Sequence, residues 1–243
     1  MRPPQKGSEK NMKTGIIGAM ASEVALLKEK MADAEVNKVA GMEFCAGKLG
    51  EADAVVVQCG IGKVNAGMCV QILADRFGVD RVINTGVAGS LDERLDVGDL
   101  LVSVDCVWHD FDVTPLGYEA GQVPGIDVLG FAADAQMRAE VVAAADAVAP
   151  DIKVLEGRVV SGDQFICTDE QKDRLTGKFH GNCCEMEGTA IAQAAYLNGL
   201  PFVVVRAMSD KPGAAEQVVD YNTFEAKAAA DCARIVLRMV AGE

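Results

Sequence analysis

The sequence predicts an α/β fold with three layers, α/β/α, around a central mixed, mostly parallel sheet. Strand-like apolar runs alternate with helix-like segments along the chain, which is typical of α/β proteins. Residues 202–209 form a long apolar run, as in a strand that is buried on both faces. Residues 42–49 and 54–59 are close enough to form a hairpin, which would add an antiparallel pair to the sheet.

The predicted strands are short apolar runs bounded by polar residues or glycine. The first covers residues 13–18 and contains Thr-Gly-Ile-Ile-Gly. Its two glycines do not complete a dinucleotide or phosphate-loop motif, so no nucleotide cofactor is expected there. The other predicted strands are residues 42–49, 54–59, 81–85, 100–107, 154–161 and 202–209.

The predicted helices show apolar residues at helical spacing. The first begins near Glu23 and carries Val24, Leu26, Leu27 and Met31. In the last helix an apolar stripe at this spacing indicates one buried face. The remaining predicted helices are residues 64–77, 134–148, 189–198 and 223–240.

Length and composition are those of one large domain. The chain has 243 residues, half of them apolar, with no internal repeat or low-complexity linker. We expect a single domain over residues 12–243, preceded by a polar extension over residues 1–11. The extension lacks the apolar core of a signal peptide, and no apolar run reaches membrane-spanning length. A cytoplasmic protein without a membrane partner is therefore predicted.

Charge and cysteine usage argue against several classes of function. The formal net charge of -13, without an evident basic face, disfavours a nucleic-acid partner. Eight cysteines lie mostly within apolar patterns, no Cys-x-x-Cys motif occurs, and there are only two histidines. Reduced, buried thiols and no metal site are expected.

Polar residues at the end of the last predicted strand are the first candidates for chemistry. Arg206, Ser209 and Asp210 stand at or just beyond this end, before Pro212. In open α/β sheets the ligand crevice lies at the carboxyl ends of the strands, although a charged surface turn would give the same pattern. Glu23 follows the carboxyl end of the first strand in the same way.

Glu185 and Glu187 form a pair of carboxylates just before an Ala-rich helical segment. Side chains at i and i+2 of an extended segment point the same way, so both could face one pocket and bind polyol hydroxyls. Acidic residues at the start of a helix also complement its macrodipole without any ligand. The pattern alone allows both interpretations.

Six motifs occur in order between about Met12 and the carboxyl terminus. They are GIIGAMASE (15–23), GIGKVNAG (60–67), NTGVAGS (84–90), SGDQFI (161–166), EME (185–187) and RAMSD (206–210). Together they resemble the bacterial 5'-methylthioadenosine/S-adenosylhomocysteine nucleosidases, which belong to the nucleoside phosphorylase superfamily. The resemblance implies hydrolysis of an N-glycosidic bond in an adenine nucleoside, with no metal or organic cofactor.

The resemblance also implies roles for individual residues. Asp210 matches the general acid that protonates adenine N7, and Ser209 matches a residue that orients this acid. Glu23 matches the residue that, with Arg206, holds and activates the attacking water. The other implied substrate contacts are Phe165 stacked on adenine, the backbone of Ile166 at the base edge, Glu187 and the backbone of Met186 at the ribose hydroxyls, and Met20, Val87, Tyr118 and Pro124.

Two departures from the family pattern bear on the substrate. Val87 stands where many relatives have a serine near the attacking water, so the water would depend more on Glu23, Arg206 and backbone groups. Residues 109–124 resemble the loop that reaches the neighbouring subunit's site in the family's homodimers. Tyr118 and Pro124 are kept there, whereas Leu116 replaces a frequent aromatic residue, and His109 is as compatible with a structural role as with ligand binding.

The residue types suit this chemistry. Breaking an N-glycosidic bond places positive charge on the sugar and negative charge on the base, which carboxylates near the sugar and an acid at the base both stabilise. Keeping Asp210 protonated at neutral pH would require a pKa shift of roughly three units, or about 4 kcal/mol. Burial could supply this shift, or Asp210 could gain its proton only when substrate binds.

Two other functions fit the same resemblance. A phosphorylase of the superfamily would use phosphate as the nucleophile, but Glu23 would repel phosphate and Arg206 is the one basic residue expected nearby. A nucleoside-binding or storage protein would keep the fold without turnover, which the joint presence of Glu23, Glu187 and Asp210 disfavours. The ranking of 5'-substituted adenosines and futalosine-type nucleosides remains open.

Overall fold

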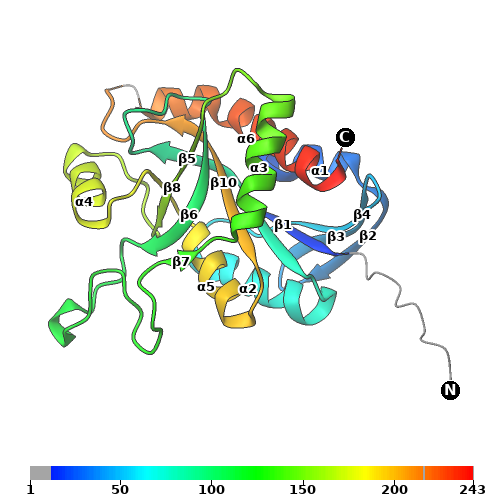
Figure 1. Ribbon diagram of the computed structural model, residues 1–243, viewed down its shortest axis with the longest axis horizontal. Helices are drawn as coiled ribbons and strands as arrows, with labels where there is room; N and C mark the ends of the chain where they lie inside the picture. Colours follow the sequence, from blue (N-terminus) through cyan, green and yellow to red (C-terminus); the bar gives the residue numbers. More distant parts are fainter. Residues whose placement is uncertain (1–11, 216, 243) are drawn as a thin grey trace.

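The computed structural model describes residues 12–215 and 217–242, and the predicted extension over residues 1–11 lies outside them. Figure 1 shows the arrangement of the elements. The strands are β1 (Thr14–Gly18), β2 (Ala32–Val39), β3 (Met42–Leu49), β4 (Ala52–Gln58), β5 (Arg81–Ser90), β6 (Leu100–Trp108), β7 (Phe131–Ala132), β8 (Val154–Ser161), β9 (Cys183–Glu185) and β10 (Phe202–Asp210). The helices are α1 (Ala21–Lys30), α2 (Lys63–Ile72), α3 (Ala135–Val148), α4 (Asp169–Phe179), α5 (Gly188–Asn198) and α6 (Gln217–Ala241), with a π-helical turn η1 (Leu73–Phe77) and a 3-10 turn η2 (Thr114–Leu116).

The described strands form one sheet that partly closes on itself. Its order is β10-β6-β8-β9-β5-β1-β4-β3-β2, with β7 paired to β6. Because β10 also pairs with β5, the strands β10, β6, β8, β9 and β5 make a closed ring. The register of β10 against β5 shifts between Met208 and Asp210, and such bulges increase the bend and twist that closure requires.

Parallel and antiparallel pairings occur equally often among the described strands. The α/β fold with a mixed sheet is therefore confirmed, but antiparallel strand pairs are more numerous than the sequence indicated. Short turns join β2, β3 and β4, and such turns connect antiparallel strands only. Ring closure adds the antiparallel pairs β5–β9 and β6–β10, which the sequence did not indicate.

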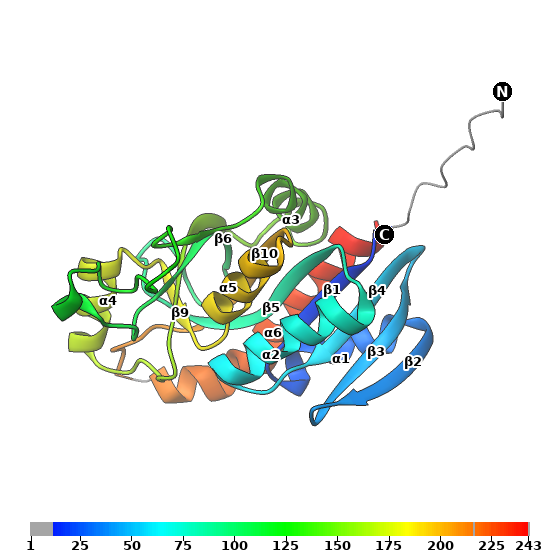
Figure 2. The ribbon, with the colours of Figure 1, turned by 90° about the horizontal axis from the view of Figure 1, so that it is seen from below.

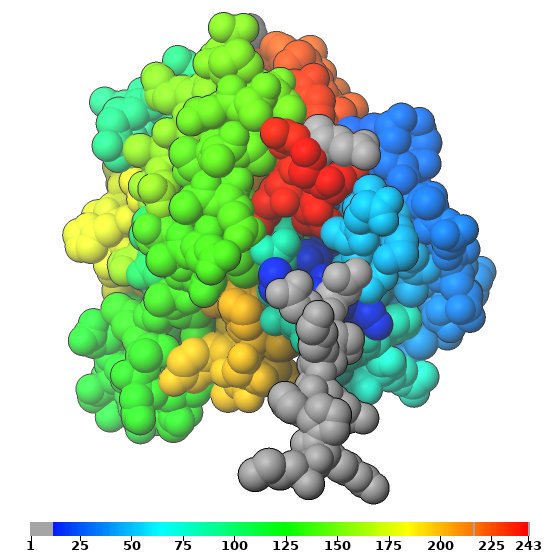
Figure 3. Space-filling model, turned by 45° about the vertical axis from the view of Figure 1, so that its right-hand side comes forward, coloured from blue at the N-terminus to red at the C-terminus, as the bar shows by residue number. Residues whose placement is uncertain are grey.

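Helices pack against both faces of the sheet. Ile16 and Ile17 are neighbours on β1, so they point to opposite faces. Ile16 belongs to a core cluster that includes residues of α1, α3 and α6, and Ile17 to a cluster that includes residues of α2 and α5. Figure 2 shows α4 and β2 at opposite ends of the molecule, and Figure 3 shows the red end of α6 between green α3 and the blue N-terminal segment.

Some elements differ from the sequence-based expectation. β2 was not predicted because it is an edge strand whose residues are mostly exposed and polar. The surface helix α4 was not predicted either, because it buries only Leu175 and Phe179 and so has no long apolar stripe. Thr168 and Gln171 form a capping box at its start, which is a sequence signal for a helix. The predicted helix over 64–77 ends in the π-helical turn η1, and α6 begins at Gln217 rather than at residue 223.

The cysteines are free thiols, as their apolar sequence context indicated. All eight cysteines are unpaired, and every one except Cys167 is buried. Across residues 12–215 and 217–242, none of the helices is both long enough and apolar enough to cross a membrane. The same residues contain no group of three or more His, Cys, Asp or Glu side chains arranged to hold a metal ion.

Several strand ends meet at one edge of the sheet. β5 pairs in parallel with both β1 and β10, which brings the carboxyl ends of these three strands together. The carboxyl end of β9, at Glu185, reaches the same region because β9 follows β8 in parallel and lies against β5. This edge is where ligands bind in open α/β folds.

Candidate active site

A pocket lies at this edge of the sheet and contains most of the predicted site residues. The segment after β1, the end of β5, the segments before α4 and α5, the end of β10 and α6 all contribute to its walls. The predicted residues that line it are Met20, Glu23, Val87, Phe165, Ile166, Met186, Glu187, Arg206, Ser209 and Asp210.

Tyr118 and Pro124 do not reach this pocket within one chain. Tyr118 lines a different hollow, beside Val107 and Phe179, and Pro124 is exposed. Both lie in the segment between β6 and β7, which extends away from the sheet in Figure 1. Their contact with the pocket of a neighbouring subunit stays a prediction. His109 is buried and does not line the pocket either.

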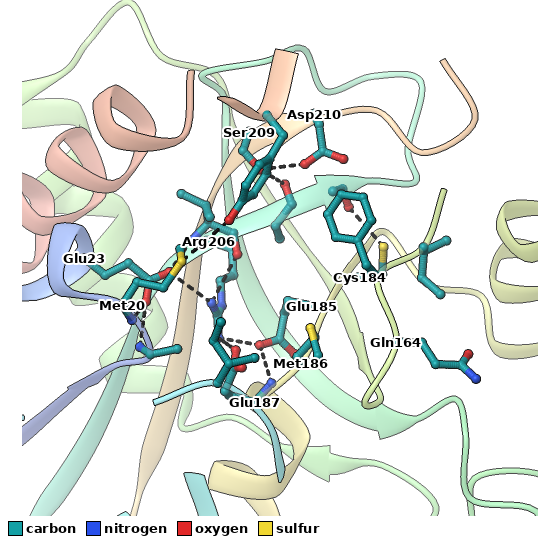
Figure 4. A pocket seen from close by; sticks show the side chains of 18 residues that line it. Met20, Glu23, Gln164, Cys184, Glu185, Met186, Glu187, Arg206, Ser209 and Asp210 are labelled. Carbon is teal, nitrogen blue, oxygen red and sulfur yellow. Dashed lines mark hydrogen bonds and ion pairs between the residues drawn. The ribbon is translucent and has the colours of Figure 1, made fainter. Parts of the chain in front are cut away.

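Arg206 lies at the centre of a buried group of carboxylates (Figure 4). Its side chain is 1% exposed and contacts the Glu185 carboxylate directly. Its Nη1 lies 3.8 Å from Glu23 Oε1, and its Nη2 lies 3.6 Å from Glu187 Oε2. The three carboxylates outweigh the loss of hydration, so the pKa of Arg206 is raised and its positive charge is retained.

Backbone and amide groups fix the orientation of this guanidinium. Nη1 of Arg206 donates to the carbonyl of Val87 at 3.1 Å, and Nη2 donates to Oδ1 of Asn84 at 2.5 Å. Only glycine fits at position 86, because a Cβ there would lie 2.2 Å from Glu23 Oε1 and 2.5 Å from Arg206 Nη1. The Asn-Thr-Gly motif thus allows the acid and the guanidinium to meet across β5.

Glu23 is held at the start of α1 by backbone donors. Its Oε2 accepts from the amides of Ala19 at 2.6 Å and Met20 at 3.0 Å. Its Oε1 accepts from the amide of Val87 at 3.0 Å. Burial raises the pKa of Glu23, and Arg206 together with the three amides opposes this rise. The carboxyl group is therefore fixed in place at the pocket wall and is a stronger base than an exposed glutamate.

Glu185 and Glu187 both line the pocket, and Glu185 also accepts hydrogen bonds at the start of α5. Glu185 accepts from the amides of Glu187 and Gly188 at the start of α5, and it also contacts Ser161 and Arg206. Glu187 accepts from the amide of Gly62 at 2.8 Å. The family resemblance implies a role for Glu187 only. The i, i+2 spacing, however, allows both side chains to point to the same side of the extended segment.

Burial raises the pKa of Glu187 to about 7, and the negative charge of Glu185 acts in the same direction, whereas Arg206 lowers it. The folded protein therefore holds a proton on Glu187 that the unfolded chain, with its ordinary value of 4.5, releases earlier. The stability that this proton contributes is present below the unfolded pKa and is lost as the pH rises through about 7.

We predict that wild type loses stability relative to Glu187→Gln between pH 5 and pH 7.5. Urea unfolding measures the unfolding free energy of each protein. The value for wild type minus the value for the variant should fall by about 1–3 kcal/mol between pH 5 and pH 7.5. Glu29→Gln removes an acid whose side chain is 71% exposed and should show no such pH dependence. A difference that is the same at both pH values would contradict the raised pKa.

Asp210 lies at the far end of the pocket from Glu187 (Figure 4). Its Oδ1 accepts from Ser209 Oγ at 2.7 Å, and its Oδ2 accepts from Gln217 Nε2 at 2.7 Å. Burial raises the pKa of Asp210, while both hydrogen-bond donors lower it. Gln217 was not predicted as part of the site, because it belongs to none of the six motifs.

The rest of the pocket wall is mostly apolar. Phe165 is 47% exposed at the rim, and Tyr221 contacts it edge-on with ring centroids 5.7 Å apart. Tyr221 lies on α6 and was also absent from the predicted site. A flat apolar wall beside a carboxyl group suits an aromatic base, whereas the buried acids around Arg206 suit a polar, hydroxylated part of the same ligand.

Comparison with known proteins agrees with this geometry. Residues 13–241 match the sequence profile of the phosphorylase superfamily. The 5'-methylthioadenosine/S-adenosylhomocysteine nucleosidase of Geobacillus thermodenitrificans is 43% identical over 230 residues, which cover 94% of this chain and 96% of that relative. The chain belongs to this nucleosidase family of the phosphorylase superfamily.

Solved structures show the same fold. The crystal structure of the nucleosidase from Colwellia psychrerythraea, in complex with adenine, has a TM-score of 0.91 and 41% identity, and 95% of each chain is covered. The futalosine hydrolase of Helicobacter pylori has a TM-score of 0.90 and 30% identity, with 97% of this chain and 100% of that chain covered. This fold is therefore shared by a nucleosidase that binds adenine and by a futalosine hydrolase.

Proposed function

We propose that the protein hydrolyses the N-glycosidic bond of 5'-methylthioadenosine, S-adenosylhomocysteine and 5'-deoxyadenosine, releasing adenine and the 5-substituted ribose. The observation that carries the proposal is that one pocket holds a buried aspartate at one end and a fixed Glu23–Arg206 pair at the other. Membership in the nucleosidase family supports the same reaction. No metal or organic cofactor takes part in it.

Asp210 is the proposed general acid. It protonates N7 of adenine while the bond between C1' and N9 breaks, so the electron pair of that bond stays on the base. Phe165 stacks on the adenine ring, the backbone of Ile166 contacts the base edge, and Ser209 orients the acid. Burial at the pocket wall supports this role, because it raises the pKa of Asp210.

Glu23 and Arg206 are the proposed water-activating pair. Arg206 orients the carboxylate, and Glu23 takes the proton of the attacking water. Val87 offers no hydroxyl, but its amide and carbonyl already hold Glu23 and Arg206 in place. Met20 lines the pocket beside Glu23. The carboxylates of Glu185 and Glu187 stabilise positive charge on the sugar, and Glu187 and the backbone of Met186 bind its hydroxyls.

The charge of the site disfavours the two competing functions. Arg206 is the one basic side chain among the described residues that line the pocket, and it faces three carboxylates. A phosphate dianion would be repelled there, which argues against a phosphorylase. A storage protein would not need a buried acid and a buried base that are both perturbed by their surroundings.

A panel of nucleosides tests the proposal. Purified protein should release adenine from 5'-methylthioadenosine, S-adenosylhomocysteine and 5'-deoxyadenosine, as followed by chromatography of the free base. Futalosine, which carries hypoxanthine, is the comparison substrate for the neighbouring activity. Faster cleavage of futalosine than of any adenine nucleoside would contradict the proposed substrate class.

We also propose that residues 12–243 form one cytoplasmic domain that works as a homodimer. An apolar patch on α2 and α5 supports this: Val64 is 72% exposed and Leu197 is 65% exposed. A hollow at this patch is also lined by Phe111 and Val123, from the segment that carries Tyr118 and Pro124. Dimer formation through this α2–α5 patch would bury it and bring that segment toward a neighbouring copy.

The Leu197→Asp variant should therefore be largely monomeric in analytical ultracentrifugation, where wild type is a dimer. Its kcat/KM for 5'-methylthioadenosine should fall about tenfold or more, because the partner's loop no longer completes the pocket. Val36→Asp changes another exposed apolar residue, on the edge strand β2, and should leave the dimer intact. A Leu197→Asp protein that remains dimeric would exclude this interface.

A further inference from the structure

Gln217, the first residue of α6, makes hydrogen bonds that no described motif predicts. It is 3% exposed. One nitrogen, Nε2, donates both to Asp210 Oδ2 at 2.7 Å and to the carbonyl of Ile166 at 2.7 Å. Its Oε1 accepts from the amide of Gly213 at 3.1 Å, which fixes the plane of the carboxamide. Both hydrogens of the amide group are therefore used inside the protein.

The two acceptors belong to the part of the pocket where the base is proposed to bind. Asp210 ends β10, and Ile166 lies in the segment between β8 and α4, so Gln217 bridges two separate walls. The 6-amino group of adenine is, like a carboxamide NH2, a planar nitrogen with two hydrogens. It can make the same pair of hydrogen bonds, whereas the 6-oxo group of hypoxanthine is an acceptor and cannot.

We propose that Gln217 is a positioning residue whose carboxamide occupies the base-recognition acceptors in the free protein and is displaced by the 6-amino group of the incoming base. The inference rests on the proposed function, because it assumes that Asp210 and Ile166 contact adenine. Because one nitrogen of Gln217 bonds to both acceptors, displacement of this one side chain would free both. Base selection then follows from competition, because a purine without this amino group does not replace the lost hydrogen bonds.

Gln217 also affects the pKa of Asp210 in the free protein. Hydrogen bonds from Ser209 and Gln217 favour the carboxylate, whereas burial and the nearby charge of Asp220 favour the acid. The other titratable groups that act electrostatically with Asp210 are Tyr221 on α6 and Cys184 on β9. When the 6-amino group replaces the Gln217 amide, it supplies the same donor to Oδ2, so Asp210 keeps both hydrogen bonds while it passes its proton to N7 of the base.

Replacing Gln217 tests the exchange. In the Gln217→Ala variant adenine has no side chain to displace, so calorimetry should show adenine binding roughly tenfold tighter than in wild type, about 1.4 kcal/mol. Hypoxanthine should not gain affinity. The basic limb of the pH profile of kcat/KM, which reports the free enzyme, should move to higher pH because Asp210 has lost a donor. Gln217→Leu keeps most of the bulk without the donors, so its pH profile should shift in the same direction.

Val218→Ala, a change at the neighbouring exposed position, is the control and should alter neither quantity. If adenine binds wild type and both Gln217 variants equally well, or binds the variants more weakly, and the pH profile is unchanged, Gln217 is only structural and the inference is wrong. If adenine binds neither wild type nor the variants, the proposed function itself fails. These two outcomes are distinguished by the wild-type titration alone.

Discussion

Asp210→Asn should lower kcat for 5'-methylthioadenosine by about 10²- to 10⁴-fold, the usual effect of losing a general acid. Asparagine keeps the size of the side chain and can still bond to Ser209, but it cannot deliver a proton to N7. Adenine should still bind, because the stacking wall at Phe165 and the Ile166 carbonyl remain. Steady-state kinetics and calorimetry with adenine measure the two effects separately.

Asp231→Asn makes the same chemical change elsewhere on α6, at a carboxylate that is 14% exposed, pairs with Lys227 and Arg234, and does not line the pocket. Its kcat should stay within about twofold of wild type, because Asp231 lies outside the pocket. Unchanged turnover in Asp210→Asn would exclude Asp210 as the acid. Loss of adenine binding together with turnover would instead assign Asp210 to base recognition.

Arg206→Met should cause the largest loss of stability, about 3–5 kcal/mol in unfolding free energy near pH 8. The variant leaves Glu23, Glu185 and Glu187 buried without the cation that they share. Near pH 5.5 the loss should be smaller, because buried carboxylates then take up protons instead of remaining charged. Urea unfolding at the two pH values measures the difference.

Arg234→Met removes an arginine whose side chain is 49% exposed and should cost less than about 1 kcal/mol at either pH. If Arg206→Met were no less stable than this control, the three acids would not depend on Arg206. Activity gives a second readout, because Glu23 loses the group that orients it. We expect no measurable turnover in Arg206→Met even where the protein is folded.

The sequence predicted the pocket better than the sheet around it. Glu23 follows one apolar run, and Arg206 and Asp210 stand at the end of another. Both strands pair in parallel with β5, which brings these ends together, so the meeting of the three residues could be predicted. Closure of the sheet could not, because it depends on β10 pairing with both β5 and β6. A strand shows the same pattern of buried residues whether it pairs with one strand or with two. The pattern therefore does not predict how many strands it pairs with.

Residues outside the motifs show a second limit of prediction from one sequence. Tyr221 lines the pocket, and Gln217 contacts two of its wall residues, only because α6 begins earlier than its apolar stripe indicated. The first turns of α6 expose Val218 and Val219, so a pattern based on a buried face does not find them. The sequence indicated Glu185 as part of a Glu-x-Glu pair. Its contact with Arg206 could not be predicted, because it depends on where β10 lies in the sheet.

The most direct test of hydrolysis is release of adenine from 5'-methylthioadenosine with and without phosphate, with the sugar product identified by mass. We expect equal rates in both conditions and free 5-methylthioribose as the product, because water is the nucleophile and the acids around Arg206 repel phosphate. Release that requires phosphate and yields a sugar 1-phosphate would contradict this function and make the protein a phosphorylase.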